Sequence, residues 1–227
     1  MRLGSCRWPD LDPDARRLLV IPLGATEQHG PHLPLETDTL IASALAEATA
    51  ARRRDVAAAP AVPYGSSGEH SGFPGTLSLG QAALEAVVVE LVRSADHFEA
   101  VVLVCCHGGN AEPVARAVTR LRREGRSVAC WQPSVEGGDA HAGRVETSLM
   151  LAIAPELVGE ERPVGATPRL EKLLPALREH GVKAVSPNGV LGDARGASEQ
   201  EGRSLLEDLV ADLSGFLDAN RPTRSAT

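Results

Sequence analysis

The segment 101–105 constrains this chain more than any other stretch. It reads Val-Val-Leu-Val-Cys and offers no polar side chain to either face of a strand. A strand that is apolar on both faces has to be covered on both faces, which is the position of a central strand in a parallel sheet. The segment therefore predicts an α/β fold in which helices cover both faces of the sheet.

The rest of the chain alternates between strand and helix patterns, as such a fold requires. We expect strands at 18–21, 56–61, 101–105 and 128–131, and helices at 38–53, 81–96, from the turn at 107–110 to about 125, 144–153, 170–180 and 199–217. Thr37 and Ser198 are the expected caps of the first and last helices, and Gly181 is expected to end the fifth. We predict one three-layer α/β/α domain around a mostly parallel sheet over residues 1–219, with a polar tail at 220–227.

Composition and charge exclude several classes of protein. The 227 residues carry a net charge of −7, which argues against nucleic acid or an anionic membrane as a partner. Apolar runs fall well short of the roughly 18 residues that a membrane helix needs. The first ten residues lack the apolar core of a signal peptide. We therefore expect a cytoplasmic protein.

The four cysteines have no spacing that suggests a zinc clip or a disulfide. They stand at positions 6, 105, 106 and 130. Cys105 and Cys106 are neighbours on a predicted strand, so their side chains point to opposite faces. Reduced and mostly buried thiols are expected.

The loop 24–38 carries the strongest functional signal. It follows a buried strand, so it lies at the carboxyl edge of the sheet, where open α/β folds place their sites. Glu27, His29 and Asp38 provide carboxylates and an imidazole, which suit zinc, iron or manganese. Asp38 begins a helix and is well placed to bridge two cations through its two oxygens.

Two further clusters occur later in the chain. His107 follows the central strand in the run Cys-His-Gly-Gly-Asn at 106–110. His141 and Glu146 lie at the start of a helix in the run 139–148.

Five of the seven histidines lie in Gly-rich loops that this fold brings to one edge of the sheet: His29, His32, His70, His107 and His141. Imidazoles and carboxylates that converge without a dominant nucleophile motif suggest a two-metal hydrolase. Such sites hold cations about 3.5–4 Å apart and lower the pKa of a shared water. Each residue also has an ordinary interpretation, since a loop histidine is often only a satisfied polar group and Glu-x-His alone is a weak pattern.

Five ordered motifs resemble the creatininase family of metal-dependent amidohydrolases. They lie at 24–38, 68–76, 107–110, 141–148 and 189–193. The resemblance implies a three-layer α/β fold, two divalent ions per chain (zinc, iron or manganese) and a ring-like homo-oligomer, a hexamer or octamer. By motif position, Glu27, Asp38 and His107 would hold one ion, and His29, Asp38 and Glu146 would hold the other.

The chain departs from creatininases proper at Gly109, where they carry an acidic residue. Glu146 is expected to supply the missing carboxylate. Trp131 is the only tryptophan beyond the N-terminal arm, so an aromatic clamp on a flat creatinine ring is not expected.

Within the family, the runs 140–152 and 185–193 look most like a branch of peptidases. This resemblance implies hydrolysis of a modified, ribosomally made precursor peptide near its C-terminus. The peptide would be an intermediate in the biosynthesis of a redox cofactor.

His141 is the first candidate for protonating the leaving amine, because it lies near Glu146 in the sequence; it could instead orient a ligand carboxylate. Glu69 and His70 are the second candidates, from a loop that could close over the site.

Four residues are candidates for binding substrate: Asn110, Phe73, Arg144 and Arg195. An arginine could pair with the C-terminal carboxylate of a peptide through two hydrogen bonds. Helix capping by Asn110, loop packing by Phe73 and surface positions for the arginines are the alternatives.

Three other functions stay open at this point. The first is small-molecule amide hydrolysis, such as opening of a creatinine-like ring or deformylation of a formamide. The second is a non-catalytic subunit that holds metal and binds a peptide. The third is a cysteine hydrolase built on Cys105 or Cys106, although the apolar strand around both argues for inert thiols.

Overall fold

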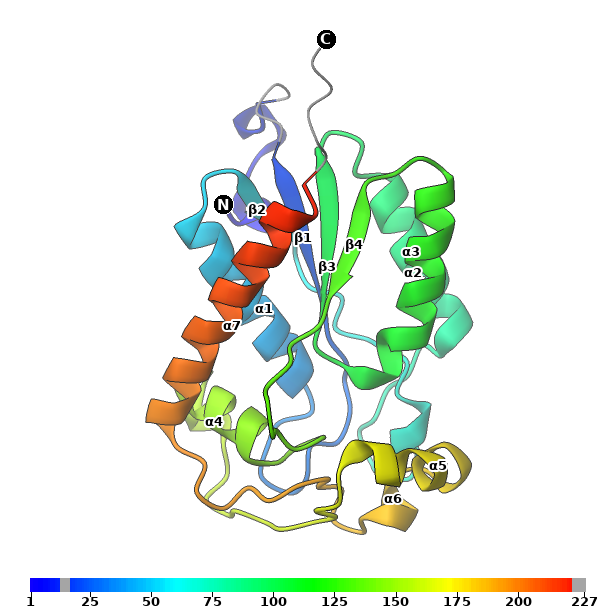
Figure 1. The fold of residues 1–227 in the computed structure, drawn as a ribbon, viewed down its shortest axis with the longest axis vertical. Helices are drawn as coiled ribbons and strands as arrows, with labels where there is room; N and C mark the ends of the chain where they lie inside the picture. The colour runs from blue at the N-terminus through cyan, green and yellow to red at the C-terminus, as the bar shows by residue number, and fades with distance from the viewer. Residues whose placement is uncertain (13–16, 222–227) are drawn as a thin grey trace.

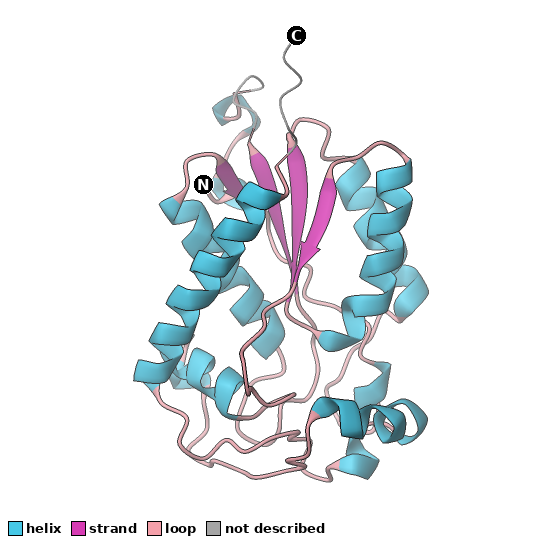
Figure 2. Ribbon diagram, viewed as in Figure 1, coloured by secondary structure: helices cyan, strands magenta, loops and turns pink. Residues whose placement is uncertain are grey.

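Four parallel strands form the centre of the molecule (Figures 1 and 2). A computed structural model describes residues 1–12 and 17–221. The strands are β1 (Leu18–Leu23), β2 (Val56–Ala58), β3 (Ala100–Cys105) and β4 (Val128–Trp131), in the order β2-β1-β3-β4. Leu18 pairs with Ala100, and all three strand pairs are parallel. The apolar segment 101–105 is therefore an interior strand, as predicted.

Seven α-helices surround the sheet in the described part of the chain. They are α1 (Thr37–Arg52), α2 (Gln81–Arg93), α3 (Ala111–Arg123), α4 (Arg144–Ile153), α5 (Leu170–His180), α6 (Val182–Val185) and α7 (Glu199–Ala219). Short 3-10 turns lie at Leu3–Ser5, Trp8–Asp10, Gly68–His70 (η4), Gly108–Asn110 (η5) and Pro155–Leu157. None of the described helices has the length and apolar character that crossing a membrane requires.

The alternation of side chains along β1 divides the interior into two cores. Leu18 and Val20 point into a core shared with α1, α4 and α7. Leu19 and Ile21 point to the opposite face, into a core shared with α2 and α3. Figure 1 shows α1 and α7 on one side of the sheet and α2 and α3 on the other. The three-layer α/β/α prediction is confirmed.

A smaller third cluster lies at the end of the molecule toward which the strands point. Leu173 and Leu177 of α5 pack there with Val182 of α6 and with Leu191, next to the partly buried Phe73. This lobe is separate from both main cores. It covers one side of the loops that follow the strands.

The helix boundaries differ from the sequence prediction in a few places. Thr37 does not cap the first helix, because it is already the first helical residue and its hydroxyl donates to the backbone oxygen of Pro34 at 2.7 Å. Ser198 does cap the last helix, accepting from the backbone N–H of Glu201. The strand expected to reach residue 61 ends at Ala58, shortly before Pro60, which lacks an N–H for pairing.

Two further sequence predictions meet different outcomes. All four cysteines are free thiols, as expected, but only Cys105 is buried and the other three are partly exposed. The predicted polar tail begins at Asn220, which directly follows α7, but its last part, 222–227, lies outside the described residues.

Shortening a buried side chain of α7 should destabilise the domain. Leu213 is fully buried between α7 and the sheet, so Leu213→Ala should cost about 2–5 kcal/mol of unfolding free energy. The matched control is Leu91→Ala on α2, where the side chain is 38% exposed and the cost should stay below about 1 kcal/mol. Urea denaturation measures both, and equal midpoints would contradict this packing.

Candidate metal centre

Seven carboxylate and imidazole side chains meet near the carboxyl ends of β1 and β3. Figure 1 shows the loops that follow these two strands. These residues come from different elements. Glu27 and His29 lie in the loop after β1, Asp38 in the first turn of α1, and His70 in η4. His107 is the second residue after β3, His141 lies in the loop before α4, and Glu146 lies in the first turn of α4. All except Glu146 are buried, and the side chain of Glu146 is 21% exposed. The predicted convergence at one edge of the sheet is confirmed for these residues.

Ligand atoms of six of these residues, all except His70, fall into three groups, in each of which the atoms lie within 4.8 Å of one another. The groups are Glu27, Asp38 and His107; His29, Asp38 and Glu146; and Glu27, His29 and His141. The first two are the sets that the family resemblance implies. Asp38 belongs to both, because Oδ1 lies 3.1 Å from His29 Nε2 and Oδ2 lies 3.4 Å from His107 Nδ1.

Three of the imidazoles are oriented by backbone carbonyls. His29 Nδ1 lies 3.1 Å from the oxygen of Glu27, and His107 Nε2 lies 3.1 Å from the oxygen of Ser66. His141 Nε2 lies 2.9 Å from the oxygen of Gln28. A carbonyl oxygen only accepts hydrogen bonds, so each of these nitrogens carries a proton, and the other nitrogen of the ring is bare when the ring is neutral.

Three carboxylate oxygens that face these nitrogens make no hydrogen bond in this structure. They are both oxygens of Glu27 and Oδ2 of Asp38, and all three are buried. Imidazole nitrogens of His70 and His107 lie 3.2 Å from Glu27 Oε1, and His107 Nδ1 lies 3.4 Å from Asp38 Oδ2. Buried charged oxygens are costly unless they are paired or coordinate a metal. Bare imidazole nitrogens opposite unpaired carboxylate oxygens form the donor set of a divalent cation, so the residues present fit such an ion.

Without a cation, protons must offset the charge of this cluster. Burial disfavours the charged ring of His29, but the carboxylates of Asp38, Glu146 and Glu27 outweigh it and raise its pKa to about 10. Burial also opposes the charged form of His107, and Glu27 with Asp38 raises its pKa well above the usual value. Burial raises the pKa of Glu146 to about 7.

The start of α4 is built to hold Glu146 toward the cluster. Oε2 of Glu146 accepts a hydrogen bond from the backbone N–H of Ala142 at 2.5 Å. Ala142 has a left-handed backbone, with φ of 52°, and is the only described non-glycine residue with positive φ. Strained backbone of this kind persists only where the surroundings enforce it.

Asp139, which is not part of the cluster, holds the backbone around Ala142 and the start of α4 in place. Its carboxylate accepts from the backbone N–H groups of Arg144, Val145 and Asp193. It thereby joins the start of α4 to the loop around residue 193. Sequence reasoning gave Asp139 no role, although an acidic residue just before a predicted helix is a recognisable signal.

The three candidate proton donors occupy different settings. Burial lowers the pKa of His141 well below its usual value, and burial together with His107 and His29 lowers that of His70 to about 3. Burial raises the pKa of the Glu69 carboxyl, whose side chain is 32% exposed and lies 3.6 Å from His107 Nε2. His70 Nε2 lies 3.2 Å from Glu27 Oε1.

The structure corrects the expectation for Asn110. Its side chain is buried and occupied, with Oδ1 accepting from the N–H of Ser66 and Nδ2 donating to the oxygen of Gly24. It does not cap α3 through its side chain. Asn110 instead ties the loops after β1 and β2 to the turn after β3.

The other candidate substrate contacts lie in two places. Phe73 packs in the α5 lobe, with the ammonium of Lys183 5.4 Å from the centre of its ring. Arg144 pairs with Glu201 at 2.8 Å, and Arg195 pairs with Asp193 at 2.7 Å. Both arginines line a cleft.

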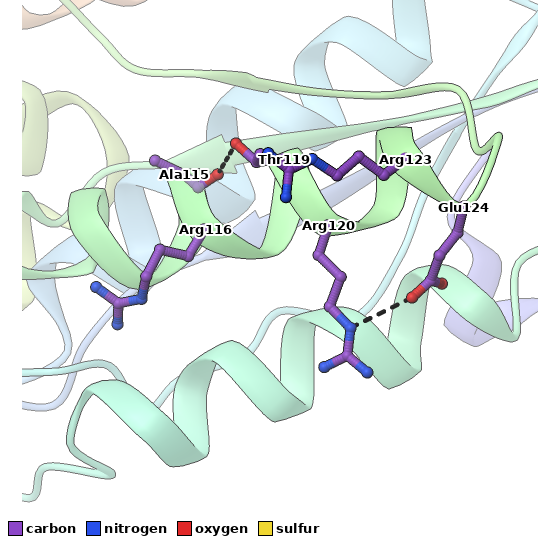
Figure 3. Close-up of a pocket in the computed structure, with 6 residues that line it drawn as sticks. All are labelled: Ala115, Arg116, Thr119, Arg120, Arg123 and Glu124. Atoms are coloured by element: carbon purple, nitrogen blue, oxygen red, sulfur yellow. Dashed lines mark hydrogen bonds and ion pairs between the residues drawn. The ribbon is translucent and has the colours of Figure 1, made fainter.

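That cleft has a volume of about 1130 Å³ and reaches the metal-ligand candidates His107 and Glu146. The loop 132–140, the start of α5 and one side of α7 line it. Figure 3 shows a separate, shallow hollow on the outside of α3, lined by Ala115, Arg116, Thr119, Arg120, Arg123 and Glu124. Arg120 pairs with Glu124 there and Arg116 pairs with Glu85, so this hollow is a salt-bridged surface remote from the candidate site.

The thiols are poorly placed for a nucleophile. Burial raises the pKa of Cys106 well above its usual value. Cys105 donates to the backbone oxygen of His107, whose ring is directed at Ser66, Glu27 and Asp38. These contacts argue against the cysteine-hydrolase alternative.

Comparisons with known proteins agree with this geometry. The family profile described as creatinine amidohydrolase, or creatininase, matches residues 4–217. The chain belongs to the creatininase family, and it is a hydrolase that acts on C–N bonds.

Among its relatives, the mycofactocin precursor peptide peptidase of Mycolicibacterium smegmatis is 46% identical over 216 residues, which cover 92% of this chain and 87% of that protein. The corresponding protein of Mycobacterium ulcerans is 47% identical over 215 residues, covering 90% of this chain and 83% of that protein. The creatinine amidohydrolase of Pseudomonas putida is 31% identical over 253 residues, covering 96% of this chain and 95% of that protein.

Solved structures share the fold. A crystal structure of creatinine amidohydrolase has a TM-score of 0.79 at 26% identity, and 98% of each chain is covered. A creatininase described as the Mn form has a TM-score of 0.73 at 26% identity, covering 98% of this chain and 99% of that chain. A creatininase variant described as the Zn–Zn type has a TM-score of 0.76 at 26% identity and covers 98% of each chain.

Adding a single methyl group at Gly109 should damage the cluster. A Cβ there would lie 2.2 Å from the oxygen of Ser66 and 2.5 Å from His107 Nε2, so it would break the contact that orients this ring. Gly109→Ala should weaken zinc binding by roughly 10- to 100-fold, as the loss of such orienting contacts does elsewhere. The neighbouring Gly108→Ala is the control, because its Cβ would meet nothing within 4 Å. Competition with a chelating dye measures both affinities, and parental affinity in Gly109→Ala would contradict the arrangement.

Metal binding should be coupled to proton release. Despite burial, the neighbouring carboxylates raise the pKa of His29 to about 10 and raise that of His107 as well, which favours protonated rings in the metal-free protein, so a cation has to displace protons. Apparent zinc affinity should rise with pH, by up to about tenfold per pH unit for each proton displaced, and fall on acidification. Calorimetry in buffers of different ionisation enthalpy counts the released protons. An affinity that does not change between pH 6 and pH 8 would show that this charge balance is wrong.

Proposed function

We propose that this chain is a two-metal peptidase that cleaves the modified mycofactocin precursor peptide near its C-terminus during biosynthesis of the cofactor. The observation that carries the proposal is Asp38, whose two oxygens face two separate donor sets. The names of relatives that are 46–47% identical over about nine-tenths of the chain support the peptide as substrate.

The proposed ligands are Glu27, Asp38 and His107 for one ion and His29, Asp38 and Glu146 for the other, with zinc, iron or manganese as the metal. Two bound cations would lower the pKa of a water molecule and polarise the scissile carbonyl. Glu146 is proposed to supply the carboxylate that creatininases proper carry at the position of Gly109. Its Oε2 lies 3.9 Å from His29 Nε2, which supports this assignment.

His141 is the proposed group that moves the proton. Its Nε2–H is held by the oxygen of Gln28, so its bare Nδ1 faces the cluster, 4.0 Å from Glu27 Oε1. A bare nitrogen in that place can take a proton from the attacking water and return it to the leaving amine. Glu69, partly exposed beside His107, is the second candidate.

The cleft offers room and charge for a peptide. Its volume of about 1130 Å³ extends from the metal-ligand candidates to Arg144 and Arg195. Both arginines are exposed and each has one carboxylate partner, and exposed ion pairs of this kind are worth little. We propose that one of them exchanges its partner for the C-terminal carboxylate of the substrate.

Two other functions use the same site. A small-molecule amidohydrolase would open a creatinine-like ring or deformylate a formamide, as the 31% identity to a creatinine amidohydrolase suggests. A non-catalytic subunit would hold metal and bind the peptide without cleaving it. We further propose a cytoplasmic homo-oligomer, a hexamer or octamer, in line with the family resemblance.

The test begins with metal content, measured by mass spectrometry on protein purified without chelator. About two divalent ions per chain are expected, with a clear fall in Asp38→Ala and none in Glu36→Ala, an exposed carboxylate two residues away. Fewer than one ion, or no fall on losing Asp38, would overturn the two-metal site.

The same preparations are then given the modified precursor peptide, creatinine and a formamide, and the products are identified by mass spectrometry. Release of a C-terminal fragment by the parent and Glu36→Ala, with a loss of at least about 100-fold in Asp38→Ala, is the expected result. Turnover of creatinine or the formamide alone would favour the small-molecule alternative. Peptide binding without any cleavage would favour the non-catalytic subunit.

A further inference from the structure

Gln28 lies between two of the proposed ligands, Glu27 and His29, and its side chain is almost completely buried. Its Oε1 accepts from the backbone N–H of Gly30 at 2.9 Å, and its Nε2 lies 3.0 Å from the backbone oxygen of Gly189. Turning the amide over would set nitrogen against an N–H donor and oxygen against a carbonyl. The two backbone contacts therefore fix which end of the amide carries the hydrogens.

The same amide nitrogen also lies near two imidazoles. Nε2 of Gln28 is 2.9 Å from His70 Nδ1 and 3.1 Å from His141 Nε2. An amide nitrogen has two hydrogens, and one of them is used by Gly189. Only one imidazole can accept the other.

The backbone of Gln28 decides between them. His141 Nε2 lies 2.9 Å from the backbone oxygen of Gln28 and donates its proton there, so it cannot accept from the amide. The second amide hydrogen therefore goes to His70 Nδ1. A neutral His70 then carries its proton on Nε2, the nitrogen that lies 3.2 Å from Glu27 Oε1.

We propose that Gln28 is a positioning residue that sorts the buried imidazoles of the proposed metal site. His29, His107 and His141 present a bare nitrogen to the cluster, whereas Gln28 makes His70 present an N–H to the carboxylate of Glu27. His70 thus holds a ligand in place and is not itself available as a ligand. The inference rests on the proposed metal-dependent function, in which Glu27 binds a divalent cation.

The fold reserves space for this amide. Gly189 has φ of 81°, and a Cβ at that position would lie 1.8 Å from Gln28 Oε1. A glycine is therefore required for the loop 186–193 to approach the side chain. This contact joins residues 161 positions apart and links the loop after β1 to the loop between α6 and α7.

The test reads the tautomer directly, on zinc-loaded protein labelled with ¹⁵N histidine. Long-range ¹H–¹⁵N correlation spectra distinguish a protonated ring nitrogen from a bare one, and a His70→Gln variant identifies the signals of His70. The expected result in the parent is a bare Nδ1 and a protonated Nε2. A protonated Nδ1 in the parent would overturn the proposal, and this result needs no variant of Gln28.

Two substitutions sharpen the test. Gln28→Glu replaces the amide donor by an acceptor, so His70 should move its proton to Nδ1, and Gln28→Met removes the donor without offering an acceptor. Both should weaken zinc binding by roughly 10- to 100-fold. Gln81→Met, at the exposed start of α2, should change neither the spectrum nor the affinity. An unchanged His70 tautomer in folded, zinc-loaded Gln28→Glu would overturn the proposal.

These readouts separate the inference from the proposed function. Neither the tautomer nor the zinc affinity depends on peptide cleavage. Expected spectra in a protein that cleaves no peptide would remove the proposed function and leave the role of Gln28 intact. If the protein cleaves the peptide but its His70 carries the proton on Nδ1, the role of Gln28 is overturned and the proposed function is kept.

Discussion

The burial of Glu27 and Asp38 without a strong cationic partner is the constraint on which the site depends. Among the ion pairs of residues 1–12 and 17–221, these two carboxylates face only imidazoles. Two buried negative charges cannot remain uncompensated in a low-dielectric interior. The protein therefore has two ways to be neutral, by taking up protons or by binding cations. The carbonyls that hold the imidazoles in place favour the second way once a metal is available.

The fold was largely readable from the sequence because it depends on local patterns. The strand 128–131 and the helices 144–153 and 170–180 have the predicted bounds. Errors occurred where an end is decided by one residue, as at Thr37, whose hydroxyl turns back to Pro34. The short helix α6 was not predicted, since four residues are too few for a periodic signal.

The candidate site was readable in part. The residue types and their positions after strands were sufficient to bring Glu27, His29 and Asp38 together with His107. The contacts that orient the imidazoles were not, because Ser66 and Gln28 hold the rings through their backbone oxygens in distant loops. Such contacts leave no pattern in a single sequence, since almost any residue can supply a carbonyl. The contacts that fix each imidazole ring can therefore be identified only from the three-dimensional structure.

The backbone of Ala142 has a consequence for how this protein can change. A side chain with positive φ costs roughly 1–2 kcal/mol that glycine would not, so selection for stability alone favours a glycine there. The backbone N–H of Ala142 also donates to the carboxylate of Glu146. A glycine at this position would make the backbone more flexible and would hold that carboxylate less firmly. Backbone strain at Ala142 therefore accompanies the placement of the Glu146 carboxylate toward the cluster.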